Sequence, residues 1–175
     1  MSKSVLQFAM LFVVLVLAQA LIFNHVALYS VALAFVFVYF IVKLPVSLSP
    51  GKVIALSFLI GLAVDIFSDT PGMNSLACTC LGGCRRTVLR LYVAREDDIA
   101  RAVPSIRSLG AGVFIKYVIS MSLIYCTLVF LIEAMSFFSP STLLMRIVAS
   151  TLLTSALLFA FDSLSIPSAA SEKRL

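Results

Sequence analysis

The residues with most chemical potential stand inside or beside apolar stretches of the chain. Asp65 lies within an apolar run, and the run ends shortly afterwards at Asp69, Thr70, Pro71 and Gly72. Burying a carboxylate in hydrocarbon is costly, so such a residue marks a functional site or a helix-packing site. Pro followed by Gly supplies the backbone angles of a tight turn. We therefore expect the tip of a helical hairpin, with Asp65 just inside it.

Glu133 and Arg146 are predicted to form an ion pair within the membrane. Glu133 ends one apolar stretch and Arg146 lies near the start of the next, so the two residues fall at similar depth. A buried arginine requires a carboxylate or a helix carbonyl as partner. Asp65 is the alternative partner of Arg146, and the sequence does not choose between them. A salt bridge that fixes helix packing is favoured over a substrate or proton site.

The sequence holds no recognisable catalytic arrangement. It has a single histidine, no metalloprotease motif and no glycine-rich phosphate loop. Cys80 and Cys84 would share a helix face, but Cys78 is rotated away from them and no nearby histidine completes a four-ligand site. All four cysteines lie in apolar segments, which argues against a disulfide framework. We expect a non-enzymatic protein without a metal or another cofactor.

The composition is that of an integral membrane protein. Of its 175 residues, 62% are hydrophobic and 12% are charged, with a mean hydropathy of +1.13. Ordinary soluble domains carry about 25% charged residues. We expect one polytopic membrane domain over residues 1–175. In such a protein the net charge of +5 reports orientation first, so we expect no nucleic-acid binding.

Six transmembrane helices are predicted, which makes the fold all-α. Their expected ranges are residues 5–23, 26–42, 53–67, 73–91, 109–132 and 143–161. The third span and the apolar part of the fourth, residues 73–84, are short for membrane spans and are joined by the Pro71-Gly72 turn, so they form a short hairpin. Ser49-Pro50 and Ser139-Pro140 are typical of helix starts, with a capping residue followed by proline.

The distribution of basic residues predicts the orientation. With six spans and both termini in the cytoplasm, the three outer loops contain no Lys or Arg, and only Lys116 and Arg146 lie inside spans. Asp162 is expected near the cytoplasmic end in contact with water. The fourth helix is expected to continue past the membrane interface from about residue 85, and a cytoplasmic basic cluster begins there: Arg85, Arg86, Arg90, Arg95, Arg101 and Arg107. Setting the topology is its favoured role, and binding of anionic lipid or of a cytoplasmic partner is the alternative.

Small residues in the hairpin predict close contact between its two helices. Gly61 and Ala63 lie in the third span, and Ala77, Gly82 and Gly83 lie in the fourth. Small side chains let helix backbones approach closely in membranes. Glycine is also common in membrane helices generally, so ordinary composition explains these residues equally well.

The stretch Gly61-Leu-x-x-Asp65, followed by Pro71-Gly72-Met73-Asn-Ser-Leu76-Ala77, resembles the family of the rod shape-determining protein MreD. The motif is confined to about residues 58–77, whereas the hydropathy is similar along the whole chain. The resemblance implies that Gly61, Asp65, Pro71 and Gly72, with Asp69 beside them, shape the hairpin and a groove that faces a partner.

The same resemblance implies a non-enzymatic scaffold of the bacterial cell-elongation complex, which directs peptidoglycan synthesis from the inner membrane. The implied partners are an MreC-like single-span protein, a RodA-type glycosyltransferase, a class B penicillin-binding protein and the actin-like MreB. The family's fold is also similar to the substrate-binding component of energy-coupling-factor transporters, a six-helix bundle. The alternative function is therefore the substrate-binding membrane component of a vitamin-type transporter. The scaffold is favoured, because a solute site usually needs several convergent polar groups and the spans carry few.

Overall fold

The computed structural model describes residues 3–23, 32–70, 72–93, 103–134 and 140–164. Within these residues the secondary structure is helical, without a strand. The helices are α1 (Lys3–Ala18), continued by the π-helical turn η1 (Gln19–Phe23), α2 (Val38–Lys43), α3 (Pro50–Ser68), α4 (Met73–Tyr92), α5 (Ile106–Leu109), α6 (Ala111–Ala134) and α7 (Pro140–Leu164).

Three helices among the described residues are long and apolar enough to cross a membrane. They are Pro50–Ser68 in α3, Ala111–Glu133 in α6 and Ser141–Ser163 in α7. A shorter apolar helix covers Leu6–Ile22. The helix α4 has the expected position, but three arginines near its end make it less apolar than the others. The all-helical architecture agrees with the integral membrane protein expected from the composition.

The prediction of a helix over residues 26–42 is wrong over residues 32–37. Residues 32–37 are not helical, and only Val38–Lys43 form the short helix α2. The segment is rich in valine and phenylalanine, whose side chains lose rotamer freedom in a helix. Its backbone groups instead bond to side chains of other helices, as described below. Residues 26–31 lie outside the described part of the chain.

The other predicted spans begin or end within a few residues of the observed helices. Ser49 is the residue before α3, and Pro50 occupies its first turn, as the sequence predicts. Pro140 begins α7. The span predicted from residue 109 begins instead at Ala111, because the short α5 precedes it. Gly110 separates the two helices with a φ of 79°, a conformation that favours glycine.

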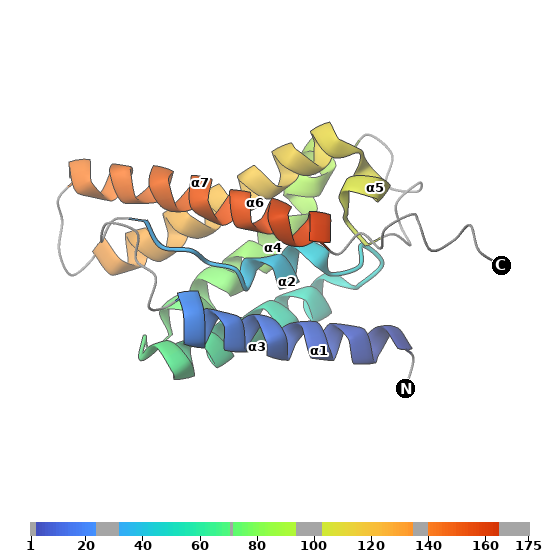
Figure 1. Ribbon diagram of the computed structural model, residues 1–175, viewed down its shortest axis with the longest axis horizontal. Coiled ribbons are helices and arrows are strands. Elements are labelled where there is room, and N and C mark those ends of the chain that lie inside the picture. The colour runs from blue at the N-terminus through green and yellow to red at the C-terminus, as the bar shows by residue number, and fades with distance from the viewer. Residues whose placement is uncertain (1–2, 24–31, 71, 94–102, 135–139, 165–175) are drawn as a thin grey trace.

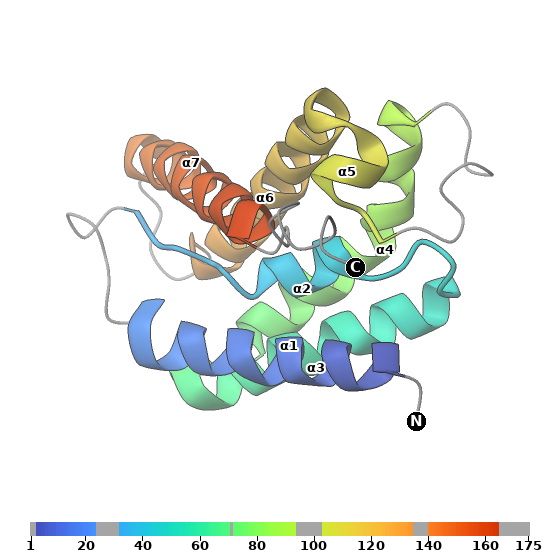
Figure 2. The ribbon, with the colours of Figure 1, turned by 45° about the vertical axis from the view of Figure 1, so that its right-hand side comes forward.

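The short helix α2 lies in the middle of the bundle. Figures 1 and 2 show α1 and α3 on one side of it, and α6 and α7 on the other. The helices α3 and α4 form a hairpin, and α4 also packs against α6. The side chains of α2 from Val38 to Val42 are buried. The non-helical segment and α2 together therefore form part of the core and are not an outer layer.

Candidate functional site

Asp65 caps the start of α4 from the facing helix α3. Its Oδ2 atom accepts a hydrogen bond from the backbone N–H of Ser75 at 2.8 Å. Its Oδ1 atom accepts bonds at 3.0 Å from the backbone N–H and the side-chain amide of Asn74, and from the hydroxyl of Thr70. A helix N-terminus leaves N–H groups without partners and favours negative charge. The carboxylate, which is only 5% exposed, therefore stabilises the hairpin directly.

Asn74 connects this cap to α6. Its side-chain oxygen accepts a hydrogen bond from the hydroxyl of Tyr125 at 2.5 Å, and its amide also donates to Thr70 at 3.0 Å. Tyr125 is fully buried on α6. Buried polar networks rigidify a core when every member finds its partner. The chain Asp65–Asn74–Tyr125, which we call the cap network, thus fixes the hairpin tip against the rest of the bundle.

The turn of the hairpin uses two residues with positive φ. Asp69 ends α3 with a φ of 53°, and Gly72 precedes α4 with a φ of 84°. A side chain at Gly72 would meet no neighbouring atom, so the backbone angle alone calls for glycine there. Asp69 is exposed. Pro71 lies outside the described residues.

Two glycines of the hairpin lie at close helix contacts. A Cβ atom at Gly61 would lie 2.6 Å from the backbone oxygen of Asn74 and from the Cα of Ser75. A Cβ atom at Gly82 would lie 2.5 Å from the hydroxyl of Ser57 on α3. Gly83, by contrast, has no such neighbour within 4 Å. Gly61 therefore brings α3 against the start of α4, where Asp65 forms its cap.

Glu133 and Arg146 are paired at the same end of the bundle. Their Oε1 and Nη1 atoms lie 2.9 Å apart, and the guanidinium carbon of Arg146 lies 4.9 Å from the ring centroid of Phe130. The side chain of Glu133 is 43% exposed and that of Arg146 is 27% exposed. Arg146 thus has Glu133 as its carboxylate partner, whereas the carboxylate of Asp65 bonds to α4.

The basic cluster is not a single exposed surface. Arg85 is buried, with 4% of its surface exposed, and its Nη2 atom donates to the carbonyl of Leu44 at the end of α2. Arg85 therefore does not form part of an exposed basic surface, because it lies on the buried face of α4 that also carries Cys78, Leu81 and Leu89. Arg86 and Arg90 are exposed on the same helix, and Arg107 belongs to α5. Arg95 and Arg101 lie outside the described residues.

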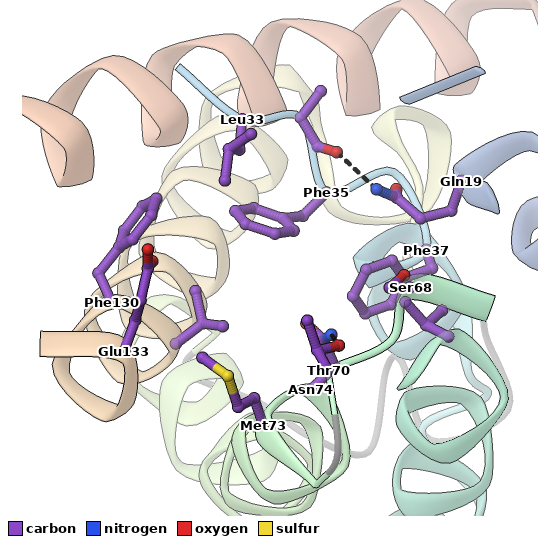
Figure 3. Close-up of a pocket in the computed structure, with 13 residues that line it drawn as sticks. Gln19, Leu33, Phe35, Phe37, Ser68, Thr70, Met73, Asn74, Phe130 and Glu133 are labelled. Atoms are coloured by element: carbon purple, nitrogen blue, oxygen red, sulfur yellow. Dashed lines mark hydrogen bonds between the residues drawn. The ribbon is translucent and has the colours of Figure 1, made fainter. Parts of the chain in front are cut away.

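A cavity of about 330 Å³ lies between the hairpin tip and the non-helical segment. Figure 3 shows its labelled side chains around an open centre, with Phe35 between Phe130 and Phe37 on one side and Met73, Asn74 and Thr70 on the other. Its apolar lining comes from Leu33, Ala34, Phe35, Phe37, Val64, Met73, Val129 and Phe130, and its polar lining from Gln19, Ser68, Thr70, Asn74 and Glu133. The cavity therefore adjoins both the cap network and the Glu133–Arg146 pair.

Gln19 holds one wall of this cavity in place. Its side-chain nitrogen donates to the carbonyl of Ala34 at 3.0 Å, the bond drawn in Figure 3, and its side-chain oxygen accepts from the N–H of Val36 at 2.9 Å. The amide thus substitutes for the backbone partners that a helix would have supplied. Gln19 begins the π-helical turn η1, an element often found at functional sites.

Two hydroxyl groups of α7 hold the same segment from the other side. The N–H of Leu33 donates to Ser150 Oγ at 2.9 Å, and the N–H of Phe35 donates to Thr154 Oγ1 at 3.2 Å. Neither residue was predicted from the sequence, and nor was Gln19. The sequence does contain a pattern that could have indicated the pair on α7. Ser150 and Thr154 are four positions apart, so their hydroxyl groups share one face of an apolar helix.

Asp162 forms a second polar cluster at the opposite end of the bundle. It is buried, forms an ion pair with Lys43, and accepts hydrogen bonds from the hydroxyl of Tyr39 at 3.2 Å and the N–H of Ile106 at 3.1 Å. The expectation that water satisfies Asp162 is therefore wrong. The carboxylate joins α7 to α2 through Lys43 and to α5 through the N–H of Ile106.

The cysteines are divided between the two faces of the helices that carry them. Cys78 and Cys126 are buried, and Cys80 and Cys84 are exposed. Among the described residues, no group of three or more possible metal ligands occurs. The chemical arrangement at the hairpin end thus consists of a capping carboxylate, an ion pair and a largely apolar cavity.

Comparison of the chain with protein-family descriptions, with characterised proteins and with solved structures found no match.

Proposed function

We propose that this protein is a non-enzymatic scaffold in the bacterial inner membrane that belongs to the cell-elongation complex. The proposal rests on the hydrogen bonds that the carboxylate of Asp65 accepts. All of its four hydrogen bonds go to the turn and to the start of α4. A carboxylate held in this way keeps the tip of the α3–α4 hairpin in one shape, and a rigid tip suits a surface on which a partner docks. The same positions, Gly61, Asp65 and Gly72, carry the resemblance to the MreD family.

A shallow groove beside the hairpin tip supports a docking role. It is lined by Leu62, Ile66 and Gly72 together with the polar residues Asp65, Asp69 and Thr70. Ile66 is 73% exposed, and the neighbouring Phe67 and Leu76 are exposed as well. Helices associate in membranes by close packing and by interhelical hydrogen bonds. A single transmembrane helix of an MreC-like protein is the partner we assign to this groove.

In the proposed orientation, both termini are cytoplasmic and the hairpin tip lies at the outer face of the membrane. The MreC-like protein would pack beside the tip, while the RodA-type glycosyltransferase, the class B penicillin-binding protein and MreB would belong to the same assembly. The absence of Lys and Arg from the predicted outer loops supports this orientation.

The test is co-purification from native membranes with variants of the groove. We expect Leu62→Ala combined with Ile66→Ala to reduce recovery of the MreC-like partner and to produce rounded cells. Leu152→Ala is a matched control, because Leu152 is exposed on α7, away from the hairpin. Unchanged recovery and normal rod shape in the double variant, at normal protein level, would count against the scaffold.

The second candidate function is the substrate-binding component of a vitamin-type transporter, and the cavity is the observation that favours it. Its volume of about 330 Å³ falls in the range of ligand pockets, roughly 300–1,000 Å³. The test is uptake of radiolabelled vitamins by cells with and without the gene. A vitamin whose uptake depends on the gene would support transport, and equal uptake of every vitamin tested would contradict it.

A further inference from the structure

The cavity at the hairpin end has a wall that is built before any ligand arrives. Residues 32–37 are not helical, yet the backbone groups of Ala34 and Val36 bond to Gln19, and those of Leu33 and Phe35 bond to α7. Non-helical backbone at membrane depth is tolerated where it is buried in protein or lines a cavity. This segment does both, since it is buried and lines the cavity with its backbone groups already hydrogen-bonded.

Aromatic rings in mutual contact form an apolar wall of the cavity. The ring of Phe35 packs edge-on against Phe130 at 6.1 Å and against Tyr125 at 5.0 Å, and Phe37 packs against Tyr125 at 5.5 Å. Because Tyr125 also bonds to Asn74, the apolar wall is connected to the cap network. Edge-to-face contacts of this kind stabilise the arrangement of the rings.

The polar part of the lining selects the charge of a ligand. No Lys or Arg occurs among the described residues that line the cavity, and Glu133 is the acidic one. A carboxylate has about four acceptor positions, and the bond to Arg146 occupies only one of those of Glu133. Thr70 offers a further acceptor, since its hydroxyl oxygen has two lone pairs. These groups receive hydrogen bonds from a donor, and no described Lys or Arg lines the cavity to bind an anion.

We propose that the cavity binds one small molecule with an apolar body and a hydrogen-bond donor, a hydroxyl or an amine, at one end. The apolar body lies against Phe35, Phe37 and Phe130, and the donor reaches Glu133 or Thr70. Such a molecule comes either from the membrane, as a lipid alcohol, or from the aqueous phase, as an aromatic amine. The site is independent of partner binding, so it goes beyond the scaffold function.

The experiment measures binding to the purified full-length protein in detergent, without partners. Farnesol represents the lipid alcohol, tryptamine the aromatic amine, and farnesyl phosphate the anionic counterpart of farnesol. Thermal unfolding and equilibrium binding of radiolabelled probe are recorded at fixed detergent concentration. Because no partner is present, this test and the co-purification test fail separately.

Variants locate the site. Val129→Phe fills the cavity from α6, and Met73→Phe fills it from α4 if the first variant does not fold. Val148→Phe adds the same bulk to an exposed position of α7. We expect farnesol, tryptamine or both to raise the melting temperature saturably in the wild-type protein and in Val148→Phe. In the filled variant the affinity should fall at least about tenfold.

The probes also decide the source and the chemistry of the ligand. Binding of farnesol alone assigns the site to a membrane alcohol, and binding of tryptamine alone assigns it to a solute. Farnesyl phosphate should bind at least about tenfold more weakly than farnesol. The proposal is overturned if neither donor probe binds saturably, if the filled variant binds as well as the wild type, or if the phosphate binds more tightly than the alcohol.

Discussion

The carboxylate of Asp65 accepts the backbone N–H of Ser75 at 2.8 Å, across the turn that joins α3 to α4. A helix is usually capped by the residue that precedes it, and α4 has no such side-chain cap from Gly72. Here the facing helix supplies the acceptor. The stability of α4 therefore depends on its packing against α3.

Replacing Asp65 by alanine should destabilise the protein by about 2 kcal/mol, because buried N–H groups of Asn74 and Ser75 lose a charged acceptor. Unfolding of the detergent-solubilised protein by sodium dodecyl sulfate measures the change. Asp69→Asn is the control, since Asp69 is exposed and asparagine tolerates its positive φ. Equal destabilisation by both variants would show that the cap at Asp65 has no special role.

Replacing Gly61 by alanine should cost about 1–3 kcal/mol, because the added methyl group would lie 2.6 Å from backbone atoms of α4. Backbone atoms cannot move aside as a flexible side chain can, so the two helices must separate. Gly83→Ala is the matched variant on α4, where nothing lies within 4 Å of the added atom. It should leave stability unchanged or raise it slightly, and a reversed order of the two variants would contradict the observed packing.

The sequence predicted the positions of most helices because hydropathy and proline placement act locally. Ser49-Pro50 and the Pro-Gly turn limit α3, and the long apolar runs of α6 and α7 need no knowledge of their neighbours. The pairing of Glu133 with Arg146 was also accessible, since both residues lie at adjacent ends of consecutive spans. Similar depth in the membrane predicted the pair, although it also left Asp65 open as a partner of Arg146.

The non-helical segment was not accessible in this way. Its hydropathy equals that of a span, and what distinguishes it is the set of side chains that bond to its backbone. Ser150 lies 117 positions from Leu33 along the chain, and Thr154 lies 119 positions from Phe35. Hydropathy contains no information about such pairs. The burial of Arg85 was not predicted for a different reason. Its charge assigned it to the cytoplasmic cluster, although Cys78, Leu81 and Leu89 share its face of α4.

Replacing Arg85 by alanine should destabilise the protein more than Arg86→Ala does. Arg85 is buried and donates to the carbonyl of Leu44, and its removal leaves that carbonyl without this partner and opens space beside α2. The expected cost is about 2–4 kcal/mol. Arg86 is exposed, so its replacement should change stability little. Unfolding curves of the two variants decide the matter, and similar curves would contradict the burial of Arg85.

Replacing Gln19 by leucine should destabilise the protein by about 2–4 kcal/mol, because the carbonyl of Ala34 and the N–H of Val36 both lose their buried partner. The leucine side chain has nearly the same size, so the change removes hydrogen bonds without opening a cavity. Gln7→Leu is the control, since Gln7 is exposed on α1 and the substitution there should be close to neutral. Hydrogen exchange adds a local measurement, in which the N–H of Val36 should exchange faster in Gln19→Leu. Unchanged protection of Val36 would mean that the segment is held by α7 alone, through Ser150 and Thr154.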